Sequence, residues 1–510
     1  MSAPRSRLAI AVAVVLGSGI ALLGPTAPSA GGPAPVDGRR APAVDADSKK
    51  LQKQVRPGRI MRHLEELQVV ADRYGDRAAG HEGYNMSSRY VEAQLREAGY
   101  EPRRQRFDFT YTRVETNTFT VAGEEIDNQV LTGSPSTDGP VTGELVAPTN
   151  AIGCTAADWE GVDATGRIAL VHRGECTFAI KSTLAKEAGA AAVVIWNNAA
   201  GPFTGGTLGE TTPDLAPTTG ITQEEGETLV AAMAAGPVEA TLDLDILVEE
   251  RRTWNVIAET DKGRDSNVVM LGAHLDSVQD GAGINDNGSG SATLLETAIR
   301  LEKHERELRN KVRFAWWGAE EVGLLGSAHY VNDLVAQDPD ALDDLAVYLN
   351  FDMVGSPNYR VGVFDADGST YEASAPVPAG SIETEQLFRT YFEAVDQPVV
   401  DTEFSGRSDY QAFIENGVAA GGLFSGGDGI KTEEEVALFG GTAGIQYDPN
   451  YHTPADDISN VDRESVDIFS NAIAHMVMTL GKSTMSIDTP SGSTRHRMVE
   501  PGLPEGATRR

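Results

Sequence analysis

The stretch Val-Val-Met-Leu-Gly-Ala-His-Leu-Asp-Ser, at positions 268–277, decides the fold of this chain. Its first four residues form a short apolar run, which is typical of a strand buried on both faces of a parallel sheet. The run leads within three residues to His274, and Asp276 follows two positions later. Side chains that can bind a metal ion therefore come directly after a core strand.

Two later apolar runs end in the same way. Residues 312–317 lead to Glu320 and Glu321, and residues 346–351 lead to Asp352. Apolar residues recur at helical spacing between the runs, and this alternation predicts a mostly parallel sheet covered by helices on both faces. Ligands of such sheets bind just outside the carboxyl ends of the strands. The acidic residues fall at that edge.

Two further segments add candidate metal ligands. Asp286 lies in Gly-Ile-Asn-Asp-Asn-Gly-Ser-Gly (283–290), a tight turn that can bring one carboxylate between two ions, and His452 follows Tyr451 in a loop. Two histidines and three carboxylates can hold two Zn²⁺ ions if one carboxylate bridges them. A single residue of this kind is more often a turn former or a helix cap, but five at one sheet edge favour a two-metal hydrolase.

Other residues of the set have narrower expected roles. Glu320 and Glu321 are adjacent and point in different directions, so one can bind metal while the other serves as a base. Asp276 can fix the imidazole of His274 by a hydrogen bond. The pair His81-Glu82 lacks the second histidine of the helical zinc motif, and the absence of a Gly-x-Ser-x-Gly motif disfavours a serine hydrolase.

Length and charge restrict the class of protein. At 510 residues the chain is too long for one ordinary core, so we expect two or three domains. The formal net charge of −33 argues against nucleic acid as a partner, because phosphate binding requires a basic surface.

The N-terminus has the pattern of a secretory signal peptide. Arg5 and Arg7 precede the apolar run 8–23, and small residues follow up to Ala30. We therefore expect residues 1–30 to be removed and the protein to be secreted, with no membrane attachment afterwards, since no later stretch is long and apolar enough to span a bilayer.

The amino-acid composition changes along the remaining chain and indicates its division into segments. We expect a linker or propeptide at 31–55 and a disordered tail at 483–510, because both are polar and rich in Pro and Gly. Residues 128–247 change to short strands with many Gly and Thr, which predicts a unit inserted into a hydrolase domain formed by 56–127 and 248–482. In an oxidising compartment its two cysteines, Cys154 and Cys176, are expected to form a disulfide.

These segments closely resemble the co-catalytic dizinc aminopeptidases, the family of secreted bacterial leucine aminopeptidases (aminopeptidase S) and the vacuolar aminopeptidase Y. The likeness covers about 59–126 and 253–482, and its motifs Ala-His-Leu-Asp-Ser, Ala-Trp-Trp-Gly-Ala-Glu-Glu and Leu-Asn-Phe-Asp-Met stand in the family's order. It implies an α/β fold of the zinc exopeptidase, phosphorylase/hydrolase-like type. Through 166–178 and 189–198, the inserted unit resembles a β-rich, α+β protease-associated (PA) domain.

The resemblance also implies a role for each site residue. The metal ligands are Asp286, which bridges two zinc ions, with His274 and Asp352 at one ion and Glu321 and His452 at the other. The groups that act on the substrate are Glu320 as general base, Tyr451 as hydrogen-bond donor to the oxyanion, and Arg407 as a substrate contact. The expected substrates are peptides with a free N-terminus and a bulky apolar first residue, and a monomer is expected.

The chain departs from the family at two places. Relatives carry a disulfide around the Tyr-His loop, where this chain has Asn450 and Ala455, so Pro449 and Pro454 are candidates for holding the loop instead. Some relatives bind Ca²⁺ near the last helix. Asp467 stands in a suitable place, but a second carboxylate is replaced by Asn471, which leaves a calcium site open.

Three other functions share this scaffold. A carboxypeptidase or dipeptidase uses the same ligands, and Arg407 could bind the carboxylate of its substrate. A glutaminyl cyclase needs only one zinc ion. A receptor-like binding protein keeps the fold and loses the ligands, whereas here every ligand is present.

Overall fold

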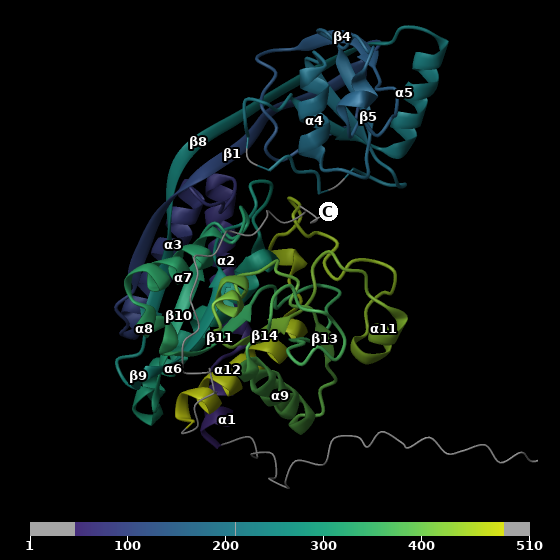
Figure 1. Ribbon diagram of the computed structural model, residues 1–510. Helices are drawn as coiled ribbons and strands as arrows, with labels where there is room; N and C mark the ends of the chain where they lie inside the picture. Colours follow the sequence, from purple (N-terminus) through teal and green to yellow (C-terminus); the bar gives the residue numbers. More distant parts are fainter. Residues whose placement is uncertain (1–45, 204, 210, 484–510) are drawn as a thin grey trace, which may run out of the picture. The chain divides into compact units, whose positions relative to one another are not determined.

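The computed structural model describes residues 46–203, 205–209 and 211–483 (Figure 1). The expected signal peptide at 1–30, the linker as far as residue 45, and the tail from residue 484 lie outside the described residues. The proposed domain boundaries are therefore discussed only for the described part.

The hydrolase domain is built on a sheet that is mostly parallel, as the sequence predicts. Its strands β9, β10, β11 and β14 are parallel neighbours, β8 runs antiparallel to β10, and β12 runs antiparallel to β14. In spatial order the strands are β13 (Val400–Thr402), β12 (Gly362–Phe364), β14 (Ala420–Phe424), β11 (Leu345–Phe351), β9 (Arg264–His274), β10 (Asn310–Trp317) and β8 (Glu239–Glu259).

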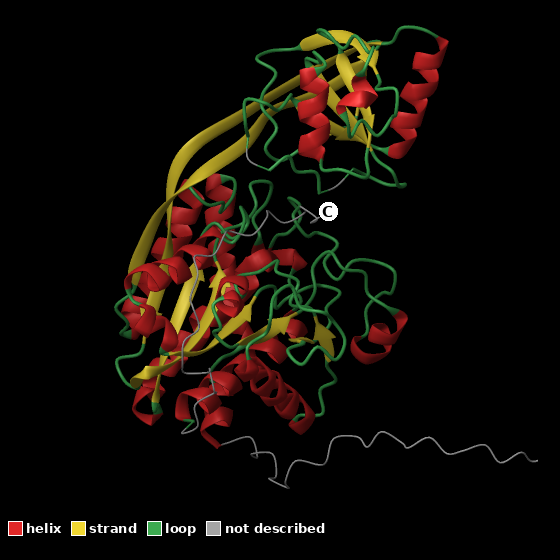
Figure 2. Cartoon of the chain, in the orientation of Figure 1, coloured by secondary structure: helices red, strands yellow, loops and turns green. Residues whose placement is uncertain are grey.

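Helices cover both faces of this sheet, which explains the apolar runs (Figure 2). Successive side chains of a strand point to opposite faces, so Val269 and Leu271 of β9 enter one core and Val268 and Met270 enter another. The first core is closed by α2 (Pro57–Tyr74), α3 (Glu82–Ala98), α6 (Gly290–Leu301), α9 (Ala379–Ala394) and α12 (Arg463–Lys482). The second is closed by α7 (Leu325–Gln337), α8 (Pro339–Asp343) and α10 (Gln411–Glu415).

The segment before α2 belongs to the folded domain, although the sequence indicates a linker there. Helix α1 (Ala46–Gln52) packs on α12, and the Ser48 hydroxyl lies 2.7 Å from Nδ1 of His475. Leu51 and Val55 are buried in the first core. Two apolar residues in a polar stretch are too weak a pattern to predict this, because the contact depends on a partner more than 400 positions away.

The inserted unit is joined to the hydrolase domain by two long strands (Figure 1). Strand β1 (Arg103–Val121) pairs antiparallel with β8 from Arg103↔Ile257 to Val121↔Ala240, with one irregularity between Val114 and Thr116. The unit's remaining strands are β2 (Glu124–Ile126), β3 (Gln129–Val130), β4 (Val141–Val146), β5 (Ile168–His172), β6 (Ala192–Trp196) and β7 (Thr218–Ile221). Its α-helices are α4 (Phe178–Glu187) and α5 (Gln223–Ala235).

Candidate metal centre

The five expected ligands converge at the carboxyl edge of the central sheet in two groups that share Asp286. In one group, Nε2 of His274 lies 3.2 Å from Oδ1 of Asp286 and 3.2 Å from Oδ1 of Asp352. In the other, Nε2 of His452 lies 3.1 Å from Oδ2 of Asp286 and 3.0 Å from Oε2 of Glu321. Each oxygen of Asp286 thus faces a different histidine, which is the arrangement a bridging ligand requires.

The donor set fits metal cations. Within each group the ligand atoms all lie within 4.8 Å of one another, and imidazole nitrogen and carboxylate oxygen are the ligands that Zn²⁺ accepts. Burial alone would lower the pKa of His274, but Glu320 and Asp352 raise it well above its ordinary value. This concentration of buried negative charge favours cations between the side chains.

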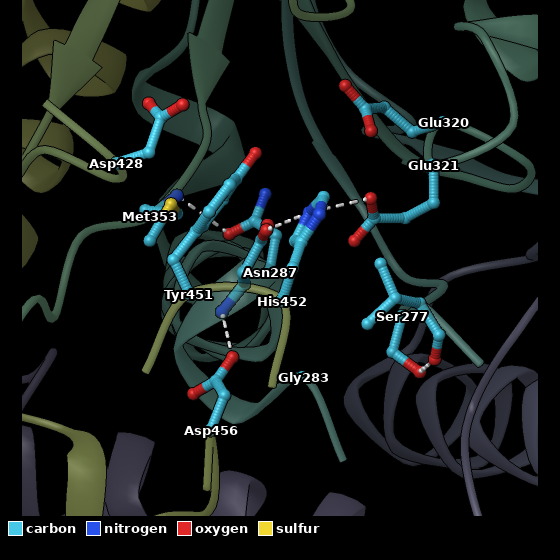
Figure 3. A network of polar contacts seen from close by, with 12 residues as sticks. Ser277, Gly283, Asn287, Glu320, Glu321, Met353, Asp428, Tyr451, His452 and Asp456 are labelled. Carbon is cyan, nitrogen blue, oxygen red and sulfur yellow. Dashed lines mark hydrogen bonds and ion pairs between the residues drawn. The ribbon is translucent and has the colours of Figure 1, made fainter. Parts of the chain in front are cut away.

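The turn after β10 presents its two glutamates in different directions (Figure 3). Glu321 is turned to His452, whereas Oε2 of Glu320 lies 3.8 Å from Nε2 of His274. The Asp276 carboxylate accepts hydrogen bonds from the backbone N–H groups of Glu320 (3.2 Å) and Glu321 (3.3 Å). Asp276 therefore positions this turn.

Asp276 contacts His274 differently from the sequence-based expectation. Nδ1 of His274 lies 3.0 Å from the backbone carbonyl oxygen of Asp276 and 3.8 Å from its carboxylate. A ring N–H on Nδ1 then donates to a carbonyl and leaves Nε2 for a metal ion. The backbone carbonyl of Asp276 orients the imidazole of His274, while its carboxylate accepts the hydrogen bonds from the turn of Glu320 and Glu321.

A residue of the segment before α10 fixes the carboxylate of Asp352 by a hydrogen bond. The hydroxyl of Ser408 donates to Oδ2 of Asp352 at 2.6 Å, and the amide of Asn350 donates to that hydroxyl at 2.8 Å. Asp409 is buried next to Ser408, and burial raises its pKa to about 8. The other carboxylate oxygen of Asp352, Oδ1, thereby points toward His274.

Hydrogen bonds hold the loop of Tyr451 and His452, at the place where the family resemblance would lead one to expect a disulfide. The Asn460 amide donates to both carboxylate oxygens of Asp448 and to Asp456, and the Asn450 amide donates to Oδ1 of Asn460 at 2.8 Å. The fixed φ of two prolines cannot supply these tertiary contacts. His452 itself has φ 56°, a left-handed conformation that costs energy in a residue with a side chain.

Two functional residues were not found by sequence reasoning. Arg77 is fully buried and donates to the carbonyl oxygens of Leu275, Ala282 and Gly283, so it holds the turn before Asp286. The carboxylate of Asp456 accepts from the backbone N–H of Asp286 at 2.9 Å (Figure 3), and burial raises its pKa to about 7. Asp456 follows the Tyr-His motif by four positions, a proximity that could have indicated it.

A cavity of about 230 Å³ opens beside the ligands. Asp286 and Asp352 line it together with Tyr451, whose ring stacks on His452 at a centroid distance of 3.9 Å. Arg407 also lines the cavity, 3.3 Å from Asp428 and 3.5 Å from the hydroxyl of Tyr451. The rest of the lining combines aromatic side chains with polar and charged ones. The aromatic residues are Phe364, Tyr371, Tyr410, Phe424 and Tyr447, and the polar and charged residues are Arg360, Thr402, Glu403, Ser405, Ser408 and Asp428.

The remaining expectations concern sites away from the cavity. Cys154 and Cys176 form a disulfide. Asp467 accepts a hydrogen bond from Asn471 on its own helix, and the metal-compatible groups formed by the described residues do not include it. Within the same described part of the chain, no helix has the length and hydropathy required to cross a bilayer.

Known sequences resemble both parts of the chain. The model of "Peptidase family M28" matches residues 255–477, and that of "PA domain" matches residues 141–229. A probable leucine aminopeptidase 2 of Aspergillus fumigatus is 43% identical over 434 residues, or 84% of each chain. Leucine aminopeptidase 2 of Trichophyton rubrum is 40% identical over 451 residues, or 88% of each chain.

Solved structures resemble the fold over nearly their whole length. The aminopeptidase from Aneurinibacillus sp. strain AM-1 aligns with a TM-score of 0.67 and 27% identity, covering 86% of this chain and 97% of that one. BSAP, a zinc aminopeptidase from Bacillus subtilis, aligns with a TM-score of 0.64 and 28% identity, covering 88% and 98%. The likeness therefore includes the inserted unit as well as the central sheet.

Proposed function

The chain belongs to peptidase family M28 and carries a PA domain, and on this basis we propose that two zinc ions at Asp286 serve to remove N-terminal residues from peptides. Its relatives are named leucine aminopeptidases, and its structural neighbour BSAP is a zinc aminopeptidase. The finer points proposed here are the number of ions, the role of each residue, the preferred first residue and secretion.

The position of Asp286 is the observation that carries the proposal. One of its oxygens faces His274 and the other faces His452, and each histidine has a further carboxylate beside it. A mononuclear enzyme, such as a glutaminyl cyclase, does not need the second complete group. Both groups support a two-ion site.

The chain's own residues supply the proton transfers. Bound zinc would polarise the scissile carbonyl and acidify a water molecule. Glu320, which is buried beside His274, accepts the proton of the attacking water and returns it to the leaving amine. Tyr451 lines the same cavity, and its hydroxyl donates to the carbonyl oxygen as negative charge develops there.

The cavity favours a bulky first residue. Asp286 and Asp352 line the cavity together with several aromatic residues, so a peptide whose first carbonyl lies at the ligands would place its first side chain in contact with aromatic surface. Burying apolar side-chain surface there contributes about 25 cal/mol per Å². Leucine, methionine and phenylalanine are suitable first residues on this argument.

Arg407 is the residue that the rival carboxypeptidase function would use. Here Asp428 pairs with its guanidinium at 3.3 Å, and both side chains are about half exposed. The pair lowers the positive charge available to a substrate carboxylate, which favours the aminopeptidase. Arg407 is then left to contact the peptide through hydrogen bonds.

The disulfide supports secretion. Disulfides such as Cys154–Cys176 persist in oxidising compartments, in agreement with the signal pattern proposed for residues 1–30. N-terminal sequencing of protein recovered from the medium tests this. A start near residue 31 is expected, or later if a propeptide is also removed, and an uncleaved N-terminus contradicts secretion by this route.

Substrate pairs and metal analysis test the activity. Purified protein should hydrolyse leucyl-p-nitroanilide and leave Nα-acetyl-leucyl-p-nitroanilide and C-terminal residues of blocked peptides intact. Elemental analysis should find two zinc ions per chain, and chelation should abolish turnover until zinc is restored. Full activity with one ion contradicts the two-zinc proposal, and release of C-terminal residues supports the carboxypeptidase.

A further inference from the structure

Arg360 is one of two arginines in the lining of the cavity, and it lies among aromatic, hydroxyl and acidic side chains. It lies just before β12, its backbone N–H donates to the carbonyl oxygen of Ser425 at 3.0 Å, and its side chain is 13% exposed. The guanidinium lies 4.8 Å from the ring centroid of Tyr447, which lines the same cavity.

The hydrogen-bonding capacity of Arg360 is largely unused. A guanidinium has five N–H donors. In the described part of the chain, Nη2 donates to the hydroxyl of Thr402 at 2.8 Å, and Nη1 lies 3.7 Å from Oε1 of Glu435. Nε is buried without a hydrogen-bond partner. Nε has almost no accessible surface, so a ligand in the cavity would meet the Nη groups, where an added acceptor contributes a charge-assisted hydrogen bond.

The charge of Arg360 is already compensated. Glu435 is nine-tenths buried behind it and also accepts a hydrogen bond from the hydroxyl of Tyr447 at 2.7 Å. Glu403, which is exposed, adds a second carboxylate to the lining of the cavity. A substrate carboxylate would meet this negative charge, whereas a neutral carbonyl oxygen would not.

We propose that Arg360 extends the specificity of the cavity to first residues that end in a neutral hydrogen-bond acceptor, glutamine in particular. The inference rests on the proposed aminopeptidase function, since it places the side chain of the first residue in this cavity. Asp286 and Asp352 line the same cavity as Arg360, and the inference is that an unbranched side chain starting at the metal ligands reaches the guanidinium. The Nη groups donate to the glutamine carbonyl.

The experiment compares glutaminyl with norleucyl p-nitroanilide, because norleucine is unbranched and lacks the acceptor. Wild-type protein and Arg360→Met are assayed with zinc, and Ki is measured for glutamine and norleucine as products. In Arg360→Met, kcat/KM for the glutaminyl substrate should fall about tenfold, the effect of one hydrogen bond to a charged donor. The value for the norleucyl substrate should change little, and only the Ki of glutamine should rise.

Two further variants make the result decisive. Arg103→Met removes an exposed arginine at the start of β1 and should leave both substrates unchanged. Arg360→Lys keeps a donor and should retain part of the glutaminyl preference, and it serves as the test if Arg360→Met does not fold. An unchanged glutaminyl-to-norleucyl ratio, or an equal loss of both substrates, overturns the inference. Failure of the wild type to cleave either substrate instead counts against the proposed function.

Discussion

At the scale of single residues, the site depends on two adjacent glutamates that point in different directions. Oε2 of Glu321 lies 3.0 Å from Nε2 of His452, while Glu320 lies beside His274 on the other ligand group. Both side chains are attached to one short turn, which Asp276 holds through two backbone N–H groups. Their different positions predict different defects.

We predict that Glu320→Gln retains zinc and loses turnover. Glutamine keeps the size of the side chain but cannot accept the proton, so kcat should fall by about two or more orders of magnitude. Glu321→Gln should instead lower zinc content, with part of the activity restored by added zinc. Steady-state kinetics with elemental analysis on both variants measures this. Near-normal turnover of Glu320→Gln, or zinc loss confined to it, would reverse the two roles.

Tyr451→Phe separates the hydroxyl from the ring. The ring stacks on His452 at 3.9 Å, and phenylalanine keeps that contact. Loss of one donor to the developing oxyanion should lower kcat about 100-fold, with KM and zinc content close to those of the wild type. A fall in zinc content would show that Tyr451 acts by supporting His452.

The convergence of the proposed ligand residues could be predicted from the sequence, because each follows a core strand or stands in a distinctive short motif. His274, Asp352 and the glutamate pair are examples, since strand ends at one sheet edge must lie close together. Arg77 could not be predicted, because its role depends on three carbonyl oxygens about 200 positions away. Such a contact leaves no periodic signal near the arginine.

At the scale of elements, the loop of Tyr451 and His452 is fixed by side-chain amides in place of a covalent bond. Asn460 joins Asp448, Asp456 and Asn450 in one network. The sequence shows that cysteines are missing at Asn450 and Ala455, but not what replaces them, because any of several polar residues could do so. Only the three-dimensional path of the loop identifies Asn460.

Asn460→Ala should weaken zinc binding at the His452 group. Removal of a group that orients a ligand from behind typically raises the metal Kd about 10-fold or more. Chelator competition measures the change. Asn471→Ala is the control, since among the described residues that exposed amide donates to Asp467 on its own helix, away from the loop. Equal zinc affinity in the two variants would mean that the backbone alone holds the loop.

Lys181 should make the inserted unit's stability depend on pH. The residue is buried, and burial lowers its pKa from 10.5 to about 8. Between these values the unfolded chain binds more protons than the folded one, so stability rises with pH from about 8 to about 10.5 and is lost as pH falls through 8. Melting curves of wild type and Lys181→Met should show the wild type gaining relative to the variant from pH 7 to pH 10. A constant difference would contradict a buried, titrating amine.

At the scale of the whole molecule, the inserted unit is joined to the hydrolase domain through paired strands. The sequence predicted the insertion from its composition and placed its boundaries at 128 and 247. Residue 128 lies beyond the end of β1 at Val121, whereas residue 247 lies inside the pairing of β8 with β1. Composition shows where the residue types change along the chain. Strand pairing shows where the inserted unit can be removed without breaking a sheet. The irregularity between Val114 and Thr116 is the more natural division.

Deletion of residues 116–245 should therefore preserve the metal site better than deletion of 128–247. The first keeps the pairing from Arg103↔Ile257 to Val114↔Ile246, and the second leaves the end of β1 without its partner. Zinc content and turnover of leucyl-p-nitroanilide should approach wild-type values in the first variant, with altered rates on longer peptides. If neither variant binds zinc, the inserted unit is part of the hydrolase core.

The contact between α1 and α12 also determines when the folding of a newly synthesised chain can be completed. Translation proceeds from the N-terminus, so Ser48 leaves the ribosome 427 residues before His475, its partner. The last metal ligand, His452, is likewise synthesised after the entire inserted unit. The first helix must wait for the last, and metal capture is a late event of biogenesis. Metal binding at the proposed site therefore requires that the chain be synthesised at least as far as His452.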